Sequence, residues 1–350
     1  MTDKAKKGRI TIKDVAKLAG VTPAVVSRVF NNDETLNIKD ETRQKVLKAM
    51  SDLNYKPNTV ARSLRTRSVN TIGMIISDIN NPFYSSIIRG VQIAAEEAGY
   101  CMILCDTHDD DLTEMKYISM LKEQFVKGII LSSTFVMDSI IKELREQDIK
   151  YVMVNRMTTE SDAPYIRTDD IKGEMDAVRY LIGLGHKRIA HISGPFYADT
   201  SIKRIQGYTR ALVEGGIKYD NRYLAEASRF EEKEGYEACK RLLERKDIKR
   251  PTAITTGNDL LAIGATHAIQ EAGLKIPDDI SLVGYNDIWM CEHLNPPLTT
   301  VHSPLCQMGR KAFEVLHAML NGEDEKVERS SIFSAELVIR ESACECKEKE

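Results

Sequence analysis

The chain has 350 residues, of which 42% are hydrophobic and 29% are charged, a composition that excludes a disordered protein and leaves room for two or three globular domains. No run of about 18 or more apolar residues occurs, which argues against a transmembrane helix, and no apolar signal-peptide core follows the basic N-terminus. We therefore expect a cytoplasmic, nucleoid-associated protein with no membrane partner, whose seven scattered cysteines are reduced thiols.

The formal net charge of −3 conceals a basic N-terminal segment. Residues 1–70 carry 15 Lys and Arg against 7 Asp and Glu, a net charge of +8, whereas the rest of the chain carries 34 against 45, a net charge of −11. A basic head on an acidic body predicts that the head binds a polyanion and the body does not. An anionic membrane surface would fit the charge alone, but the helical pattern of the head, without a continuous hydrophobic face, favours DNA.

Residues 11–32 contain two short helical patterns separated by a glycine. Thr11 and Asp14 are spaced as a capping box for the first helix, and Thr22 followed by proline is typical of the start of a second helix. A third amphipathic pattern covers residues 40–53. Two short helices joined by a tight turn form the helix-turn-helix layout, in which the second helix presents its N-terminal residues to base edges in the major groove.

A short linker follows the three helices. Pro57 disfavours helix at the preceding residue, and Asn58 can cap a new helix over residues 59–64, which read TVARSL. So short a helix is unstable alone in water. We expect it to form only against a partner or on DNA.

From residue 71 onward, apolar runs alternate with amphipathic helical patterns in two successive series. The expected strands are residues 72–76, 102–105, 128–131, 151–154, 189–192, 223–227, 253–256 and 281–285. The expected helices are residues 83–98, 115–125, 139–145, 173–184, 201–214, 235–244 and 260–272. This alternation predicts two doubly wound parallel-sheet lobes of the α/β class behind an all-α head.

Two such lobes should enclose a cleft between them. In open sheets of this kind, ligands bind beyond the carboxyl ends of the strands. The candidate ligand-binding segments are therefore residues 78–84, 106, 132–133, 155–156, 194–204, 258–259 and 286–287.

Sequence motifs along nearly the whole chain, residues 10–341, resemble the LacI/GalR family of bacterial transcription regulators. The head carries TIKDVAKLAGV, VSRVFNN and YKPNTVARSL, and the body carries TIGMIISDINNPFY, LIGLGHKRIAHISG, IPDDISLVGYNDI and PPLTTVHSP. The resemblance implies a homodimer, sometimes a tetramer, whose heads bind a pseudo-palindromic operator as a repressor. It implies a body of two lobes like the type I periplasmic binding proteins, holding a small effector that is usually a sugar or a purine.

The resemblance also implies domain boundaries. The head is expected at residues 1–57, the hinge helix and linker at 58–70, the body at 71–340, and a frayed charged tail at 342–350. The chain is expected to cross between the lobes three times, near Thr168, Thr300 and Ser330. The first lobe would then hold residues 71–168 and 300–330, and the second 169–299 and 331–341.

For the head, the resemblance implies which side chains face DNA. Pro23, Ala24 and Arg28 match base-facing positions, and an arginine such as Arg28 can donate two hydrogen bonds to guanine, although a phosphate contact or a solvated charge is the alternative. The phosphate-binding candidates, which set register rather than sequence preference, are Thr11, Thr22, Ser27 and Asn31.

For the linker, Leu64 matches the wedge that this family inserts in the minor groove, usually at a central CG step. The alternative is a leucine that packs only against the partner of a dimer. Asn58 would cap this helix, and Ala61 would leave room for the partner's helix. Lys39 departs from the family, which often has serine as the cap of the third helix.

For the cleft, the resemblance assigns Arg204 to effector hydroxyls or a carboxylate and Phe230 to stacking on a ligand ring, with Phe83, Tyr84 and Asn258 as further contacts. The alternatives are a surface position for Arg204 and core packing for the aromatic residues.

Asn155 and Asn286 stand where the family often has aspartate, and Arg156 follows Asn155. Two fewer carboxylates with Arg156 and Arg204 retained would favour an anionic effector, such as a sugar acid or a sugar phosphate, over a neutral sugar.

Other functions find less support in the sequence. It contains no P-loop, GxGxxG, GxSxG or HExxH motif, so we expect neither an enzyme nor a catalytic residue, cofactor or metal site. A solute-binding protein would fit the body but not the basic head. Within the family, a global catabolite regulator controlled by a protein partner remains the alternative to control by a small carbohydrate.

Overall fold

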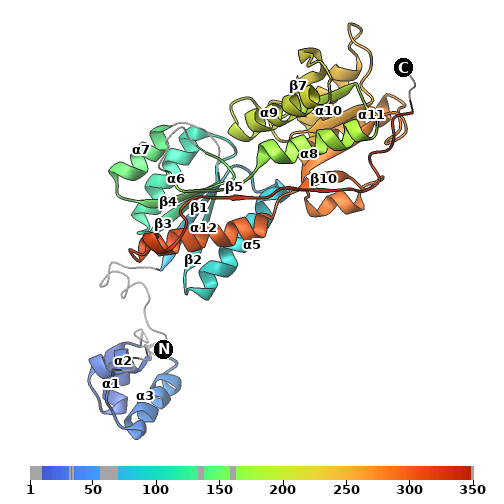
Figure 1. Ribbon diagram of the computed structural model, residues 1–350. Helices are drawn as coiled ribbons and strands as arrows, with labels where there is room; N and C mark the ends of the chain where they lie inside the picture. Colours follow the sequence, from blue (N-terminus) through green and yellow to red (C-terminus); the bar gives the residue numbers. More distant parts are fainter. Residues whose placement is uncertain are drawn as a thin grey trace, which may run out of the picture. The chain divides into compact units, whose positions relative to one another are not determined.

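The computed structural model describes residues 10–30, 33, 35–55, 70–132, 138–157 and 163–347 (Figure 1). The chain divides into two compact units, Met1–Ser68 and Val69–Glu350. Within the described ranges, no helix is both long and apolar enough to cross a bilayer.

The head consists of α1 (Ile12–Ala19), α2 (Pro23–Phe30) and α3 (Asp40–Asp52). At the start of α1 the Asp14 carboxylate accepts from the Thr11 N–H at 2.8 Å and from the Thr11 hydroxyl at 2.7 Å, so the Asp14 half of the capping box forms. The helices meet in a small core of Val15, Ala16, Val26, Val29, Val46 and Ala49. No side-chain cap forms at Lys39, before α3.

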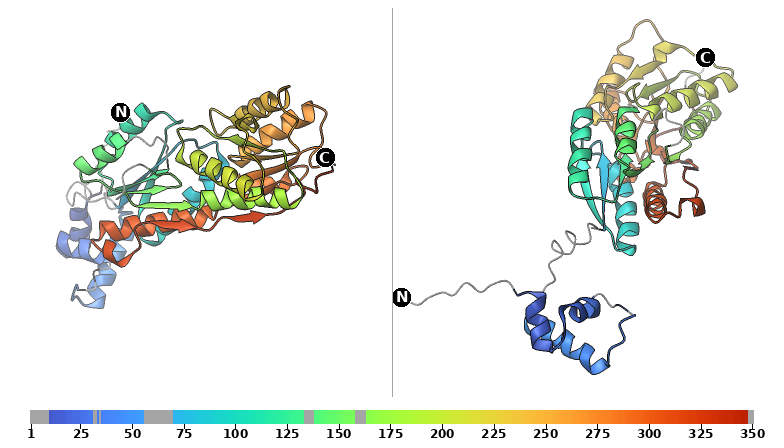
Figure 2. Two further views of the ribbon diagram at one scale, coloured as in Figure 1. Left: turned by 45° about the horizontal axis from the view of Figure 1, so that its top comes forward. Right: turned by 90° about the vertical axis from the view of Figure 1, so that its left-hand side faces the viewer.

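The first lobe of the body is a six-stranded parallel sheet in the order β11-β5-β4-β3-β1-β2 (Figures 1 and 2). Its strands are β1 (Thr71–Ile76), β2 (Cys101–Asp106), β3 (Gly128–Ser132), β4 (Lys150–Val154), β5 (Tyr165–Thr168) and β11 (Ser331–Phe333). Its helices are α5 (Pro82–Glu97) and α12 (Leu305–Leu320) on one face, and α6 (Asp111–Glu123) and α7 (Asp138–Glu146) on the other. Strand β1 is buried on both sides, as a central parallel strand should be.

The second lobe repeats this design in the order β12-β10-β9-β8-β6-β7, with only β12 antiparallel to its neighbour. Its strands are β6 (Ile189–Ser193), β7 (Leu224–Glu226), β8 (Ala253–Thr256), β9 (Ser281–Asn286), β10 (Thr299–His302) and β12 (Glu336–Val338). Helices α8 (Asp170–Gly183) and α9 (Asp199–Glu214) cover one face, and α10 (Glu232–Leu243) and α11 (Asp259–Glu271) cover the other. The fold class expected from the sequence is confirmed.

Two of the expected crossings between the lobes lie a few residues too early. Strand β10 pairs with β9 and therefore belongs to the second lobe, so the second crossing follows His302 rather than Thr300. Strand β11 pairs with β5 in the first lobe, so the third crossing follows Phe333 rather than Ser330. The expected first-lobe segment 300–330 and second-lobe segment 331–341 are corrected accordingly.

The expectation of a frayed tail is wrong for residues 342–347. Ser342 is buried, and its hydroxyl donates to the Leu282 carbonyl at 2.6 Å while its own carbonyl accepts from the Leu282 N–H at 2.8 Å. Further along, the Cys346 N–H donates to the Leu184 carbonyl at 2.8 Å. Satisfied backbone groups hold this segment against the second lobe.

Helices α5 and α12 approach so closely that neither has room for a side chain at the contact. A Cβ at Gly309 would clash with the Ile87 carbonyl oxygen, which belongs to the backbone and cannot rotate away. We expect Gly309→Ala to lower the free energy of unfolding by about 1–3 kcal/mol, as overpacking does. Urea unfolding followed by circular dichroism measures the change.

Gly183→Ala is the matched control, because Gly183 is exposed on α8 and a Cβ there meets nothing within 4 Å. Alanine at this site should raise stability by up to about 1 kcal/mol, since it restricts the unfolded chain. Equal effects of the two substitutions would contradict the close approach of α5 and α12.

Candidate functional site

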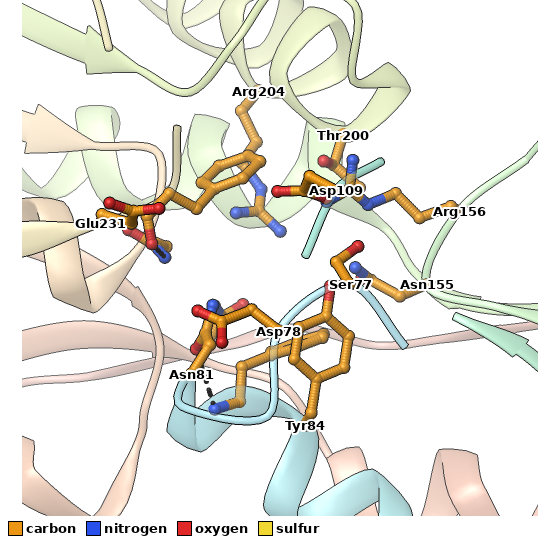
Figure 3. Close-up of a pocket in the computed structure, with 14 residues that line it drawn as sticks. Ser77, Asp78, Asn81, Tyr84, Asp109, Asn155, Arg156, Thr200, Arg204 and Glu231 are labelled. Atoms are coloured by element: carbon orange, nitrogen blue, oxygen red, sulfur yellow. Dashed lines mark hydrogen bonds between the residues drawn. The ribbon is translucent and has the colours of Figure 1, made fainter. Parts of the chain in front are cut away.

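A cavity lies between the two lobes at the carboxyl ends of their strands (Figure 3). The first lobe contributes Ser77, Asp78, Asn81, Phe83, Tyr84, Asp109, Asn155 and Arg156. The second lobe contributes Thr200, Arg204, Phe230, Glu231, Asn258 and Asn286. This position follows from the two sheets, because the parallel strands within each sheet all end at the same edge.

All eight residues that the sequence analysis named as effector contacts line this one cavity. They are Phe83, Tyr84, Asn155, Arg156, Arg204, Phe230, Asn258 and Asn286. Three further lining residues lie outside the segments expected from the sequence, one to four residues beyond the ends of the expected strands. They are Ser77, Asp109 and Glu231. A wider window after each apolar run would have included them.

Arg204 is held by the protein itself. Its Nε and Nη2 lie 2.9 and 2.8 Å from one carboxylate oxygen of Asp170, and its Nη1 donates to the Gly257 carbonyl. The guanidinium also lies 3.6 Å from the centroid of the Tyr285 ring. Burial raises the pKa of Asp170, and the neighbouring Arg204 opposes that rise. The Asp170 carboxylate balances the positive charge of Arg204. Few N–H donors of the guanidinium remain for a ligand carboxylate.

Arg156 has more hydrogen-bond donors available to a ligand than Arg204 has. Only 5% of the residue is exposed, and its guanidinium lies 5.4 Å from the centroid of the Phe230 ring across the cleft. Its Nε and Nη1 have no hydrogen-bond acceptor in the described part of the chain. Figure 3 places Arg156 and Arg204 on different sides of the cavity, with Tyr84 below them on α5. Two buried donors without acceptors are costly unless something binds them.

The backbone conformation at positions 155 and 286 favours asparagine. Asn155 has φ = 69°, and Asn286 and Asp287 have φ = 108° and 58°. Asparagine tolerates positive φ better than most residues, since its short side chain bonds locally. The amide oxygen Oδ1 of Asn286 is buried and accepts no hydrogen bond from any described residue. The side chain therefore presents an acceptor to the cavity.

Three other candidates near the cleft have structural partners. Asn258 caps α11, with its Oδ1 accepting from the Leu261 N–H at 2.9 Å. Asp259 accepts from the Thr300 hydroxyl at 2.6 Å and the Ile288 N–H at 2.9 Å, and burial raises its pKa to about 6.

Asp287 likewise serves the structure, since it accepts from Arg340 at 2.8 Å. Its other oxygen lies 3.0 Å from Nδ1 of His302. Asp259 and Asp287, both within candidate segments, do not line the cavity.

The head presents the expected DNA-facing residues on its surface. Thr11, Thr22, Pro23, Ala24 and Arg28 are exposed, whereas Ser27 is half-buried. The Arg28 Nε donates to Asp33 at 2.7 Å and its Nη2 donates to the Thr35 hydroxyl at 2.8 Å. The hydrogen bonds that Asp33 accepts from Arg28 and from the hydroxyl and N–H of Thr35 lower its pKa to about 2. Four other candidates, Asn31, Asn58, Ala61 and Leu64, lie outside the described residues.

Two family models match the chain with the same division between head and body. Residues 11–58 match the model of "bacterial regulatory proteins, lacI family", and residues 69–341 match that of "periplasmic binding proteins and sugar binding domain of LacI family". The chain belongs to the LacI family. It is a DNA-binding transcriptional regulator.

Relatives of this LacI-family regulator align along almost its whole length. The transcriptional repressor PurR of Vibrio vulnificus (strain CMCP6) is 38% identical over 337 residues, covering 95% of this chain and 98% of PurR. The transcriptional regulator DegA of Bacillus subtilis (strain 168) is 35% identical over 337 residues, with the same coverage of 95% and 98%.

Solved structures agree with this assignment. The lac repressor dimer bound to operator and the anti-inducer ONPF is 27% identical, with a TM-score of 0.85 over 96% of this chain and 99% of that one. The transcriptional regulator CelR in complex with cellobiose is 31% identical, with a TM-score of 0.73 over 96% of this chain and 100% of that one.

The Arg204–Asp170 pair of the regulator offers a stability test. Asp170→Ala leaves the Arg204 charge buried without its partner, so we expect the free energy of unfolding to fall by about 3–5 kcal/mol. Glu214→Ala is the control, because Glu214 pairs with Arg179 at the surface, where both side chains are about half exposed and the loss should be below about 1 kcal/mol. Urea unfolding measures the change in the free energy of unfolding for both variants. Similar losses would show that the buried pair contributes no more to stability than the surface pair.

Proposed function

We propose that the chain is a repressor that binds a pseudo-palindromic operator as a homodimer, with its DNA affinity set by a neutral, hydroxyl-rich effector in the interlobe cleft. The observation that carries the effector class is the set of unsatisfied groups on the cavity wall. Arg156 supplies donors at Nε and Nη1, and Asn286 and Asp109 supply acceptors at Oδ1, none of them paired within the described residues. Hydroxyl groups donate and accept, so a carbohydrate satisfies both kinds of wall group.

The charges of the cleft support a neutral effector. Arg204 is neutralised by Asp170, and Arg156 is attracted by the nearby carboxylate of Asp199. Asp78, Asp109 and Glu231 also line the cavity. Two arginines without enough carboxylates to balance them would favour a sugar acid or a sugar phosphate. That imbalance is absent from the described cleft, so we favour a neutral sugar.

The aromatic residues suit a ring-shaped effector. The Phe230 ring packs directly against Gly194, where a Cβ would collide with it. The lack of a side chain at Gly194 therefore makes room for the ring in this position. Phe83 and Tyr84 pack edge to face with centroids 5.1 Å apart on the opposite wall. Apolar ring faces combined with a few polar groups are the usual design of small-molecule sites.

A purine effector is the second candidate. The similarity to several PurR repressors, up to 38% identical, favours it, and a purine base also stacks on aromatic rings while donating and accepting hydrogen bonds. A carbohydrate is favoured by the solved complexes of CelR with cellobiose and of an Enterococcus faecium LacI-family regulator with ribose. Control by a protein partner, as in catabolite regulators, would not require a ligand in the cleft.

In the head, we propose that Arg28 reads a base and that Asp33 and Thr35 orient it. Arg28→Ala should weaken binding to an operator, selected from a duplex library with a fixed central CG step, by about 1–3 kcal/mol, or roughly 5- to 150-fold. Binding to random duplex should change little. Gel shifts at fixed salt measure both affinities.

Lys45→Ala is the control for lost positive charge, because Lys45 lies on α3 and pairs with Glu41 at the surface. It should leave the ratio of specific to random binding unchanged. Equal losses on operator and random duplex for Arg28→Ala would make Arg28 a phosphate contact instead.

The effector class is tested by thermal shift on the full chain. Neutral sugars such as D-ribose, D-galactose and cellobiose, the acids galacturonate and gluconate, ribose 5-phosphate, and the bases adenine and guanine are screened separately. We expect stabilisation by a neutral sugar, because binding to the folded state raises its melting temperature. Asn286→Ala should weaken that stabilisation. Stabilisation confined to an acid, a phosphate or a purine would overturn the neutral-sugar proposal.

A further inference from the structure

Asp199 lies at the boundary between the two lobes without belonging to the cavity lining. It is the first residue of α9 in the second lobe, and its side chain is only 15% exposed. Its Oδ2 lies 4.0 Å from Nη1 of Arg167, on β5 of the first lobe, and 3.9 Å from Nζ of Lys203, one turn along α9. Both separations are too long for hydrogen bonds.

The groups that face Asp199 come from several elements. Arg156 and the Met157 amide follow β4, Arg167 lies on β5, and Asp170 begins α8. Burial raises the pKa of Asp199 to about 6, with Arg156, Arg167 and the Met157 amide opposing the rise and Asp170 reinforcing it. A carboxylate near several cations would keep a low pKa if those cations bonded it well.

Several buried hydrogen-bonding groups on both sides of this boundary lack partners among the described residues. Apart from the Met157 N–H, which lowers its pKa, Asp199 accepts no hydrogen bond from a described residue, and Nε of Arg167 and both Nε and Nη1 of Arg156 lack acceptors there. Unpaired buried charges of opposite sign cost free energy that direct contact would recover. These donors belong to the first lobe and the acceptor to the second, so movement of the lobes toward each other can join them.

We infer that Asp199 is an interlobe clasp: when the lobes close, its carboxylate takes hydrogen bonds from Arg156 and Arg167, so that the ionised side chain favours the closed body. This inference rests on the proposed function only in that closure is the state that the effector selects. Asp199 is then a positioning residue, because it acts on the effector through Arg156. It couples effector control to proton concentration, since protonation removes the charge that the clasp needs.

Hydrogen exchange of the full chain without any effector tests the clasp. At about pH 7.5, Asp199→Asn should speed exchange severalfold in peptides covering residues 153–157, 165–168 and 199–204, which face each other at the boundary. After correction for intrinsic rates, wild type at about pH 5 should resemble the variant, because its carboxyl is then mostly protonated. Unchanged exchange in the variant would overturn the clasp.

Thermal stability separates the clasp from a merely structural role. Burial raises the pKa of Asp199 to about 6, above the ordinary value of an aspartate. The charge therefore destabilises the folded chain as pH rises through that window, and asparagine removes the cost. Asp199→Asn should therefore keep or raise the melting temperature at about pH 7.5. Glu214→Gln, at the opposite end of α9 and paired at the surface, should change neither exchange nor melting. A fall in melting temperature for Asp199→Asn would show an ordinary buried ion pair and overturn the clasp.

A double-mutant comparison tests the partner. Arg167→Met alone should speed exchange at the same peptides, and combining it with Asp199→Asn should add little, because both remove one contact. Additive effects would overturn the pairing. The exchange arms use no effector, so their failure leaves the sugar screen intact, and a failed sugar screen leaves the exchange result readable.

Discussion

The buried pair between Arg204 and Asp170 is the constraint on which the architecture of the cleft depends. Asp170 is the first residue of α8, directly after the chain enters the second lobe for the first time, and Arg204 lies on α9. Their contact, with the Gly257 carbonyl and the Tyr285 ring, joins two helices to the ends of β8 and β9. The Arg204 guanidinium therefore holds the start of the second lobe and one wall of the binding cavity in place together.

The rest of the cavity wall is shaped by backbone conformation as much as by side-chain chemistry. The positive φ values at Asn155 and Asn286 place short amide side chains at two strand ends. The ties from Asp287 to Arg340 and His302 hold one of these bends. A cleft built this way keeps its shape in each lobe, and the freedom that regulation needs is left to the three crossings between the lobes.

Much of the architecture follows from the sequence, and the failures have physical causes. The alternation of apolar runs and amphipathic helices was enough to predict both sheets, because buried parallel strands are almost continuously hydrophobic. Strands β10 and β11 have only four and three residues, too few to show a period, and this displaced the boundaries expected near Thr300 and Ser330. Helix α12 carries a readable apolar pattern through Leu305, Met308, Ala312 and Leu316, although it lies outside the two series of strands and helices expected from the sequence. The cleft residues were found through family motifs, whereas the neutralisation of Arg204 by a residue 34 positions away leaves no trace in local sequence.

The bonds between Arg28 and the loop that follows its helix have an evolutionary consequence. Asp33 and Thr35 hold the guanidinium from outside α2, so they help to determine where its remaining donors point. Substitutions in this loop would redirect Arg28 while leaving every residue of α2 unchanged. With base reading by Arg28 as proposed above, descendants of this regulator would acquire new target sites through drift in a polar loop, while the helix itself stays unchanged.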